Sequence, residues 1–208
     1  MKVVLYGASG KAGSRILHEL QARGHEVTAI VRNHPERLPM GTKSAQDDLS
    51  DVAKTAQTLG GADAVVSAYG PPANDTDQLI GVTERLIEAV QKAGVPRLIV
   101  VGGAASLEVA PGVTLLASGH LPGPWVPIAT SHAKALDVLK KSGINWTYFS
   151  PAAFFEPGER TGKFRLGKDS LIADQTGPSR ISMEDYAIAL VDELERPAHE
   201  RARFTIGS

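Results

Sequence analysis

The amino-acid sequence predicts an α/β fold in which one doubly wound parallel β-sheet is covered by helices on both faces. Short β-branched runs alternate with longer amphipathic segments, as repeated strand–helix–strand units require. The apolar runs at 64–67 and 98–101 are nearly continuous, which is typical of parallel strands buried on both faces. The length of 208 residues, with 42% hydrophobic and 22% charged residues, suits a single globular domain.

The individual elements follow from these runs and from the spacing of apolar residues. Strands are expected at 3–6, 27–31, 64–67, 98–101 and 146–149. Helices are expected around 16–20, 79–90, 133–139 and 186–194. Ser182 is expected to cap the last helix, with Asp185 three residues further on. The irregular stretches 102–127 and 152–177 are expected to be loops over a site rather than domain boundaries.

The composition excludes several classes of function. The formal net charge is −1, so the chain has no overall attraction for nucleic acid or an anionic membrane. No apolar run approaches the ~20 residues that a membrane span needs. There is no cysteine, which excludes disulfides and thiolate chemistry, and no histidine pair has metal-ligand spacing on one helix face. We therefore expect a cytoplasmic monomer or homodimer that acts on a small molecule and holds no structural metal.

A glycine-rich turn directly follows the first expected strand and opens the first helix. It reads Gly7-Ala8-Ser9-Gly10-Lys11-Ala12-Gly13. Of the three glycines, the first permits a tight turn, the second lets backbone N–H groups approach a pyrophosphate, and the third allows close helix–strand packing. The helix N-terminus favours an anion at the same place. The turn therefore predicts a dinucleotide site; the alternative is a tight strand–helix turn without a ligand.

The end of the second strand bears on which dinucleotide is bound. An Asp or Glu at this position usually bonds the ribose 2′-hydroxyl of NAD, and none is present. Arg32 stands there instead and is suited to a 2′-phosphate, with Lys11, His34 and Arg37 as further positive charges. The sequence thus favours NADP(H) over NAD(H), the alternative being that Arg32 is an ordinary surface residue.

Several segments together resemble a known family. They are 7–13, Asp47-Asp48-Leu49, 66–70, 101–107, 149–155, 157–162 and 181–187. The chain resembles the atypical short-chain dehydrogenases/reductases of the NAD(P)H-binding family. This group includes NADH-flavin reductases, biliverdin reductase B-like proteins and NmrA-like regulators. The resemblance implies a Rossmann-type fold, and the last two segments are most similar to the flavin-reductase branch.

The resemblance also implies a set of cofactor contacts at the carboxyl ends of the strands. Asp48 and Leu49 are expected at the adenine, although an Asp there is also suited to cap a helix. The other implied contacts are Ala68, Tyr69 and Gly70 beside the adenosine ribose and phosphates, Gly102 and Gly103 at the nicotinamide ribose, Pro151, Ala152, Ala153 and Phe154 along the nicotinamide, and Lys134. Each of these is also compatible with ordinary loop chemistry.

The proton relay of typical superfamily members is missing from this sequence. None of the four tyrosines is followed by a lysine four positions later, and Thr130 stands four residues before Lys134. A threonine hydroxyl is too weak an acid for the proton transfer that ketone reduction or epimerisation requires. His132 is the one histidine near the expected site, and it is our candidate catalytic residue. It could protonate or steer an acceptor, or it could be a surface or capping histidine.

The two long loops offer further candidates. Glu156, Glu159 and Arg160 either contact the substrate or pair with one another. Trp125 either stacks on a flat ring or packs on the core as a hinge.

Two functions fit these observations. The first is an NADPH-dependent reductase of a flat conjugated acceptor, above all free flavin, with FMN or riboflavin as a dissociable substrate. Flavin needs no tyrosine–lysine relay because it delocalises the charge that it receives. The second is a non-catalytic NADP(H)-binding sensor of the NmrA type. The missing relay makes an epimerase or dehydratase the least favoured reading.

Overall fold

The computed structural model describes residues 1–32, 38–174 and 177–208. Within these residues lies an eight-stranded sheet in the order β10-β12-β8-β5-β4-β1-β2-β3. All neighbouring strands are parallel except β10, which is antiparallel to β12. The strands are β1 (Lys2–Tyr6), β2 (Glu26–Val31), β3 (Lys43–Gln46), β4 (Ala64–Ser67), β5 (Leu98–Val101), β8 (Trp146–Ser150), β10 (Arg165–Gly167) and β12 (Ala202–Gly207). This confirms the predicted doubly wound α/β fold.

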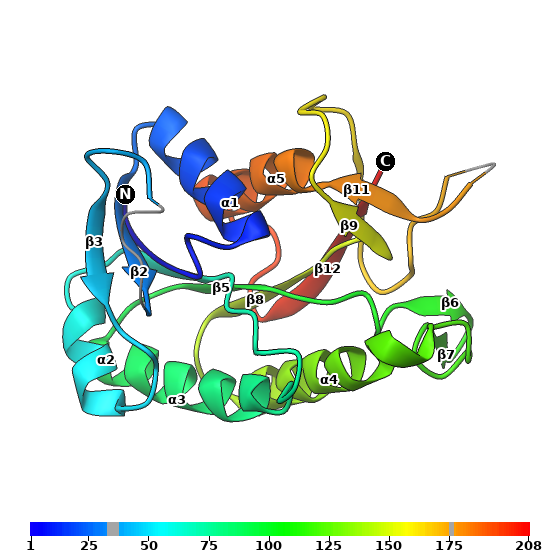
Figure 1. Ribbon diagram of the computed structural model, residues 1–208, viewed down its shortest axis with the longest axis horizontal. Helices are drawn as coiled ribbons and strands as arrows, with labels where there is room; N and C mark the ends of the chain where they lie inside the picture. The colour runs from blue at the N-terminus through cyan, green and yellow to red at the C-terminus, as the bar shows by residue number, and fades with distance from the viewer. Residues whose placement is uncertain (33–37, 175–176) are drawn as a thin grey trace.

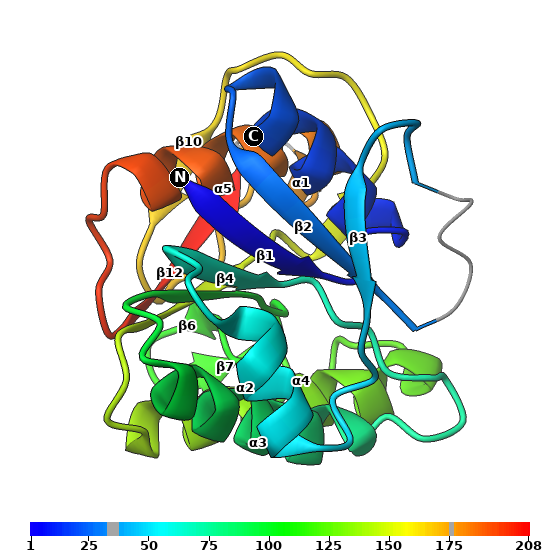
Figure 2. The same ribbon diagram turned by 90° about the vertical axis from the view of Figure 1, so that its left-hand side faces the viewer.

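Helices cover both faces of the sheet, as Figure 1 and the turned view in Figure 2 show. On one face lie α1 (Lys11–Ala22) and α5 (Met183–Glu195). On the other lie α2 (Val52–Leu59), α3 (Gln78–Ala93) and α4 (Val126–Lys141). The strand order reverses between β1 and β4, and Figure 1 looks onto the carboxyl ends of the strands. In open α/β sheets, ligands bind at this edge and at this reversal.

The apolar core lies in two clusters, one on each face of the sheet. On the α1–α5 face, Phe149 stacks between Tyr186 and Phe204, with ring centroids 4.1 and 4.0 Å apart. The Tyr186 hydroxyl donates a 2.7 Å hydrogen bond to the Phe149 carbonyl, which satisfies the one polar atom of that ring. These contacts join β8, β12 and α5, so the Phe149 ring near the carboxyl end of β8 is packed between α5 and β12.

Helix ends agree closely with the expected signals. Gly94 ends α3 in the left-handed conformation (φ 67°). The Ser182 hydroxyl accepts from the Asp185 N–H at 3.0 Å, as a capping box predicts. However, α4 begins at Val126, inside the stretch expected to be loop. Pro127 fits there because the N–H groups of a first helical turn have no partner within the helix.

Smaller elements lie within the two long stretches. They are β6 (Glu108–Ala110), β7 (Val113–Thr114), the 3₁₀ helix η2 (Gly123–Trp125), β9 (Phe154–Glu156) and β11 (Arg180–Ser182). The pairs β6–β7 and β9–β11 form separate two-stranded sheets. The stretches are also joined to each other, because Glu108 N–H donates to Asp169 O and Leu171 N–H donates to Glu108 O, both at 2.8 Å. Backbone hydrogen bonds therefore hold the two long stretches together beside the site.

Two further histidines have defined side-chain partners. The side chain of His25 is only 6% exposed, and its Nε2 atom lies 2.9 Å from Glu195. The ring of His199 stacks on Phe204 at 4.1 Å. His34 and Arg37, the expected further charges beside Arg32, lie outside the described residues. In the described ranges, no helix is both long and apolar enough to cross a membrane.

Candidate functional site

The glycine turn has the geometry that the sequence predicts. Gly7 has φ of 74°, a conformation that favours glycine, and a Cβ atom there would lie 2.3 Å from the Ala68 carbonyl oxygen. A Cβ atom at Gly13 would lie 2.0 Å from the Gly7 carbonyl oxygen, so α1 packs directly on the turn. A Cβ atom at Gly10 would meet only that same oxygen, at 3.2 Å, so its other side is open. The first and third glycines thus serve packing, and the second leaves a free approach to the backbone.

The N-terminus of α1 is open to an anion. Gly10 is the N-cap residue, so no side chain caps the helix, and its first turn holds no acidic residue. The unpaired N–H groups of a first helical turn carry a partial positive charge and bind phosphate groups. The uncapped first turn of α1 is therefore suited to the pyrophosphate of a dinucleotide.

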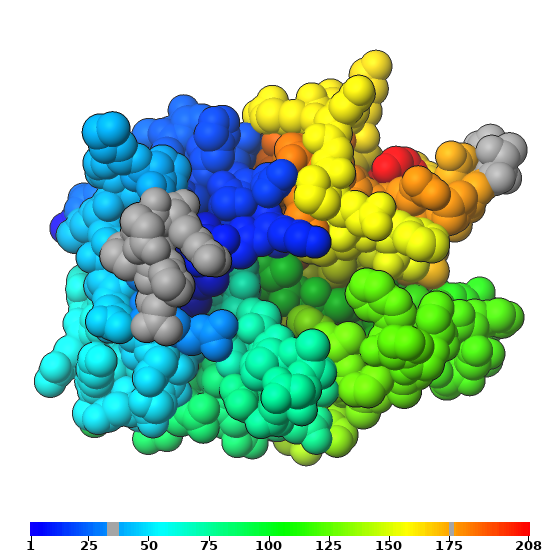
Figure 3. Space-filling model, in the orientation of Figure 1, coloured from blue at the N-terminus to red at the C-terminus, as the bar shows by residue number. Residues whose placement is uncertain are grey.

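A cavity of about 350 Å³ opens beside this turn. Its lining comes from the carboxyl ends of β1 to β4 and includes Gly7, Ser9, Gly10, Lys11, Ala12, Gly13, Arg32, Asp48, Leu49, Ala68, Tyr69 and Gly70. All of these residues were expected to bind the cofactor. The side chain of Ala8 is buried in the core instead. Figure 3 shows this edge of the molecule, hollowed between the blue residues of the turn and the cyan to green residues below them.

Two carboxylates line the cavity, and both are held by the chain. Asp47 is buried, where it accepts from the Tyr6 hydroxyl at 2.8 Å and from the Leu49 N–H at 3.0 Å. Burial raises the pKa of Tyr6, and its bond to Asp47 adds to the rise, so the phenol stays protonated as donor. Asp48 accepts from the hydroxyl and N–H of Ser50, and these bonds lower its pKa. The Asp48 carboxylate thus remains charged and exposed at the expected adenine position.

Leu49 has an unusual backbone conformation for a residue with a side chain. Its φ is 60°, and it is buried. Its N–H donates to Asp47, and its carbonyl accepts a 2.6 Å bond from Arg85 Nε. Such conformations cost about 1–3 kcal/mol and persist where the surroundings fix them, often at ligand sites. Burial and these two hydrogen bonds hold Leu49 in this conformation at the floor of the cavity.

Arg32 lies at the end of β2 and is exposed at the cavity. Its backbone carbonyl accepts a 2.7 Å bond from the Gln46 side chain. Its guanidinium carbon lies 5.8 Å from the centroid of the Tyr69 ring. No carboxylate in the described part of the chain forms an ion pair with Arg32, so its charge is available for a ligand.

The carboxyl end of β5 reaches the next part of the edge at Gly102 and Gly103. A Cβ atom on Gly102 would lie 2.3 Å from the Tyr148 ring, and one on Gly103 would lie 3.0 Å from the His132 ring. The Tyr148 hydroxyl accepts from the Gly103 N–H at 3.0 Å and donates to the His132 carbonyl at 3.1 Å. Tyr148 is not among the sequence-based candidates, because Ala152 and not a lysine stands four residues after it. Its ring is buried, which raises its pKa, so Tyr148 holds the loop rather than supplies protons.

His132 lies beside this loop, against Gly103 and Tyr148. It is half-buried, and its Nδ1 atom lies 3.3 Å from the Tyr148 hydroxyl oxygen. Burial lowers the pKa of His132 to about 4, far from the neutral value that suits a proton donor. The imidazole is therefore neutral at physiological pH. It can hydrogen-bond to a ligand, but it is not a ready general acid.

The remaining candidates lie outside the cavity, either after β8 or on η2 and α4. Ala152 is buried, whereas Phe154 is half exposed at the start of β9; neither lines the cavity. Pro151 and Ala153 adjoin them at the carboxyl end of β8. Lys134 lies on the exposed side of α4, apart from the cavity. Trp125 is 63% exposed, so it is not a hinge packed on the core.

The charged residues of the 156–160 segment do not pair with one another. Arg160 instead donates to the buried carboxylate of Glu19 on α1, at 3.0 to 3.2 Å. Next to it, the N–H groups of Thr161 and Gly162 both donate to Asp185 at 2.8 Å. These bonds attach the loop to α1 and α5. Sequence reasoning missed them because the partners lie 141 and 24 residues apart in the chain.

Comparison with known proteins agrees with this geometry. The model of a family described as NAD(P)H-binding matches residues 7–197. YwnB of Bacillus subtilis (strain 168), an uncharacterised protein, is 42% identical over 212 residues, which span 100% of this chain and 99% of YwnB.

Solved structures share the whole fold. A "putative epimerase" from Bacteroides thetaiotaomicron is 46% identical, with a TM-score of 0.92 over 99% of this chain and 96% of its own. A "putative NADH-flavin reductase" from Streptococcus pneumoniae TIGR4 is 36% identical, with a TM-score of 0.91 over 100% and 99%. A "putative exported protein" from Burkholderia pseudomallei is 43% identical, with a TM-score of 0.90 over 100% of both chains.

Proposed function

Because the chain belongs to the NAD(P)H-binding family of oxidoreductases, we propose that it is an NADPH-dependent reductase of free flavin or a similar flat conjugated acceptor. The observation that carries this proposal is the chemistry of the expected nicotinamide end. His132 is neutral there, and the Tyr148 hydroxyl is buried with a raised pKa. Within the described ranges, these groups provide no acid–base pair at physiological pH.

The binding roles follow from the residues around the cavity. The uncapped first turn of α1 is suited to the pyrophosphate, and Leu49 and Tyr69 offer apolar surface beside the adenosine. The Arg32 guanidinium, which has no ion pair among the described residues, supports a preference for the 2′-phosphate of NADPH. When bound, the nicotinamide supplies a hydride, which a flavin accepts at N5. The chain's task is then to position two flat rings and exclude water.

The type of acceptor follows from what such a site lacks. A ketone needs a proton delivered to its oxygen as the hydride arrives. An epimerase needs a base and an acid at one carbon, so the name of the Bacteroides protein does not match the residues of this site. A flavin delocalises the added charge over its rings, and solvent can supply the later proton. A neutral His132 is sufficient for that reaction.

Steady-state oxidation of NADPH in the presence of candidate acceptors tests the proposal. We expect turnover with FMN or riboflavin and none with simple aldehydes. Substitution His132→Ala should slow flavin reduction less than tenfold, because it removes a hydrogen bond and not a proton donor, which would contribute about 10²–10⁴-fold.

Two outcomes would contradict the proposal. Tight NADPH binding without turnover of flavins, quinones or linear tetrapyrroles would favour the non-catalytic sensor. Rapid reduction of an aldehyde would mean that another residue supplies the proton.

A further inference from the structure

The short strands β9 and β11 pair in parallel beside the expected nicotinamide position. Their register places Arg180 directly opposite Phe154. The next residues on both strands, Phe155 and Ile181, pack into the core on the α1–α5 face. Because side chains alternate along a strand, Phe154 and Arg180 share the face that points away from this core. The core contacts thus fix where the exposed pair stands.

The two exposed side chains touch each other. The guanidinium carbon of Arg180 lies 5.4 Å from the centroid of the Phe154 ring, and the Phe154 side chain is 50% exposed. Several other arginines pair with carboxylates, as in Arg15–Glu184 and Arg203–Asp169. In the described ranges, Arg180 has no ion pair. Its charge is therefore as available to a ligand as that of Arg32.

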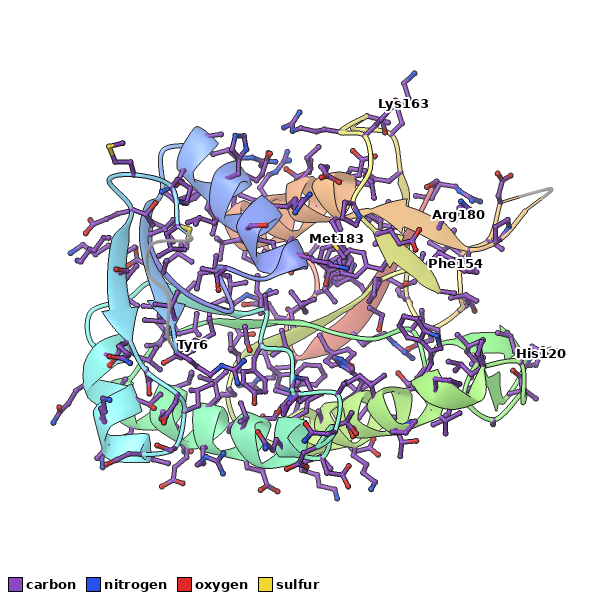
Figure 4. The ribbon with its side chains drawn as sticks, viewed as in Figure 1. Tyr6, His120, Phe154, Lys163, Arg180 and Met183 are labelled. Atoms are coloured by element: carbon purple, nitrogen blue, oxygen red, sulfur yellow. The ribbon has the colours of Figure 1, made fainter. Side chains whose placement is uncertain are left out.

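The pair lies at the far end of the same sheet edge. Phe154 directly follows 151–153, at the carboxyl end of β8, three strands away from β1. Figure 4 shows Phe154 and Arg180 together on β9 and β11 at the right, with Tyr6 of β1 well to the left of them. Arg32 follows β2 and Arg180 lies on β11, so they stand on opposite sides of β1 and β4 along this edge, each over an aromatic ring.

From this arrangement we propose that Phe154 and Arg180 form a binding site for the acidic group of the acceptor. Phe154 contacts the flat ring system, and Arg180 binds a phosphate or carboxylate attached to it. The inference deepens the proposed reductase function, because it adds an anionic group to the flat acceptor. Arginine suits both anions, since its planar guanidinium donates two parallel hydrogen bonds.

The expected size of the effect follows from exposure. Arg180 is exposed, so its ion pair with a ligand is worth less than a buried one. We expect Arg180→Ala to weaken binding of an anionic acceptor about fivefold. Binding of the neutral counterpart should not change.

Two matched pairs of acceptors test this and separate the two anions. FMN and riboflavin differ by a phosphate, and a linear tetrapyrrole diacid and its dimethyl ester differ by two carboxylates. For each pair, KM is measured with the wild type, Arg180→Ala and the control Lys163→Ala. Lys163 is exposed on the loop above β9 and away from the cleft, and its loss removes the same charge (Figure 4). We expect Arg180→Ala alone to raise KM for the acidic member of at least one pair.

A direct binding measurement tests this inference separately from the proposed function. Titration of FMN and riboflavin into the NADP⁺-bound protein, followed by flavin fluorescence, needs no turnover. The tetrapyrrole diacid and its ester are titrated in the same way and followed by their own absorbance. If Arg180→Ala selectively weakens the binding of FMN or of the diacid, the anion site is supported even if no acceptor is reduced. An Arg180→Ala protein that binds the acidic and neutral members of both pairs as the wild type does would overturn it.

Discussion

At the residue scale, the proposed preference for NADPH rests on the Arg32 guanidinium after β2, which forms no ion pair within the residues that the structure describes. Arg32 is exposed at the cavity, and its guanidinium lies over the Tyr69 ring. Arg32→Ala should weaken NADPH binding by about 1.5–3 kcal/mol, the range for a hydrogen bond to a charged group. NADH lacks the 2′-phosphate, so its affinity should stay the same and serves as the control. Fluorescence titration of both nucleotides measures this; equal losses would show that Arg32 does not select between them.

His132 makes a prediction about stability rather than rate. Burial lowers its pKa from 6.5 to about 4, so between these values the unfolded chain binds a proton that the folded protein does not. The free energy of unfolding should therefore fall as the pH falls from 6.5 towards 4. His132→Gln removes this contribution and should show a shallower decline.

Urea unfolding at several pH values across that window provides the measurement. His120→Gln is the matched control, because His120 is exposed. The same slope in the wild type and His132→Gln would mean that the histidine is not kept neutral by burial.

At the scale of elements, two glycines of the same turn should have different roles, Gly13 in stability and Gly10 in nucleotide binding. A Cβ atom at Gly13 would lie 2.0 Å from the Gly7 carbonyl oxygen, so Gly13→Ala must displace backbone and should cost about 1–3 kcal/mol of stability. A Cβ atom at Gly10 meets only that oxygen, at 3.2 Å. Gly10→Ala should therefore fold normally but bind NADPH roughly tenfold or more weakly, because the methyl group stands where the pyrophosphate approaches.

For both variants, chemical denaturation measures the free energy of unfolding and titration with NADPH measures the affinity. If Gly10→Ala binds NADPH like the wild type, the pyrophosphate does not lie against that residue.

The same scale shows which elements a sequence can predict. The bounds of β4 and β5 agree with the expected runs because buried parallel strands are apolar throughout. β3, with the sequence Lys-Ser-Ala-Gln, is an exposed edge strand without such a run, and its bounds could not be read from the pattern. β12 was not expected; it pairs with β8, more than 50 residues earlier in the chain. Periodicity reports burial and not pairing between distant segments.

The candidate site divides in the same way. The glycine turn is local, so its spacing alone predicted its geometry. The charge state of His132 depends on burial by residues from other elements, and the Arg180–Phe154 pair joins segments 26 residues apart. Such features need the folded chain, which is why the sequence left the role of His132 open and did not indicate the Arg180–Phe154 pair.

At the scale of the whole molecule, cofactor binding should connect segments that are distant in sequence. The cavity is lined by 47–49 and 68–70 together with the glycine turn, which follow three different strands of one sheet. A ligand that touches all of them binds only the folded protein. It therefore raises the free energy of unfolding by about 2.7 kcal/mol at one hundred times its dissociation constant.

This stabilisation predicts a measurable shift in melting temperature. For a domain of 150–250 residues, each kcal/mol corresponds to about 2–4 °C, so saturating NADPH should raise Tm by roughly 5–10 °C. At the same concentration NADH should raise it less, because Arg32 has no phosphate to bind. The difference between the nucleotides should vanish in Arg32→Ala. In Gly10→Ala the shift should fall with both nucleotides, because tenfold weaker binding of NADPH lowers the stabilisation from about 2.7 to about 1.4 kcal/mol. A uniform shift in all three proteins would place the nucleotide somewhere other than this cavity, since neither substitution would then touch the bound molecule.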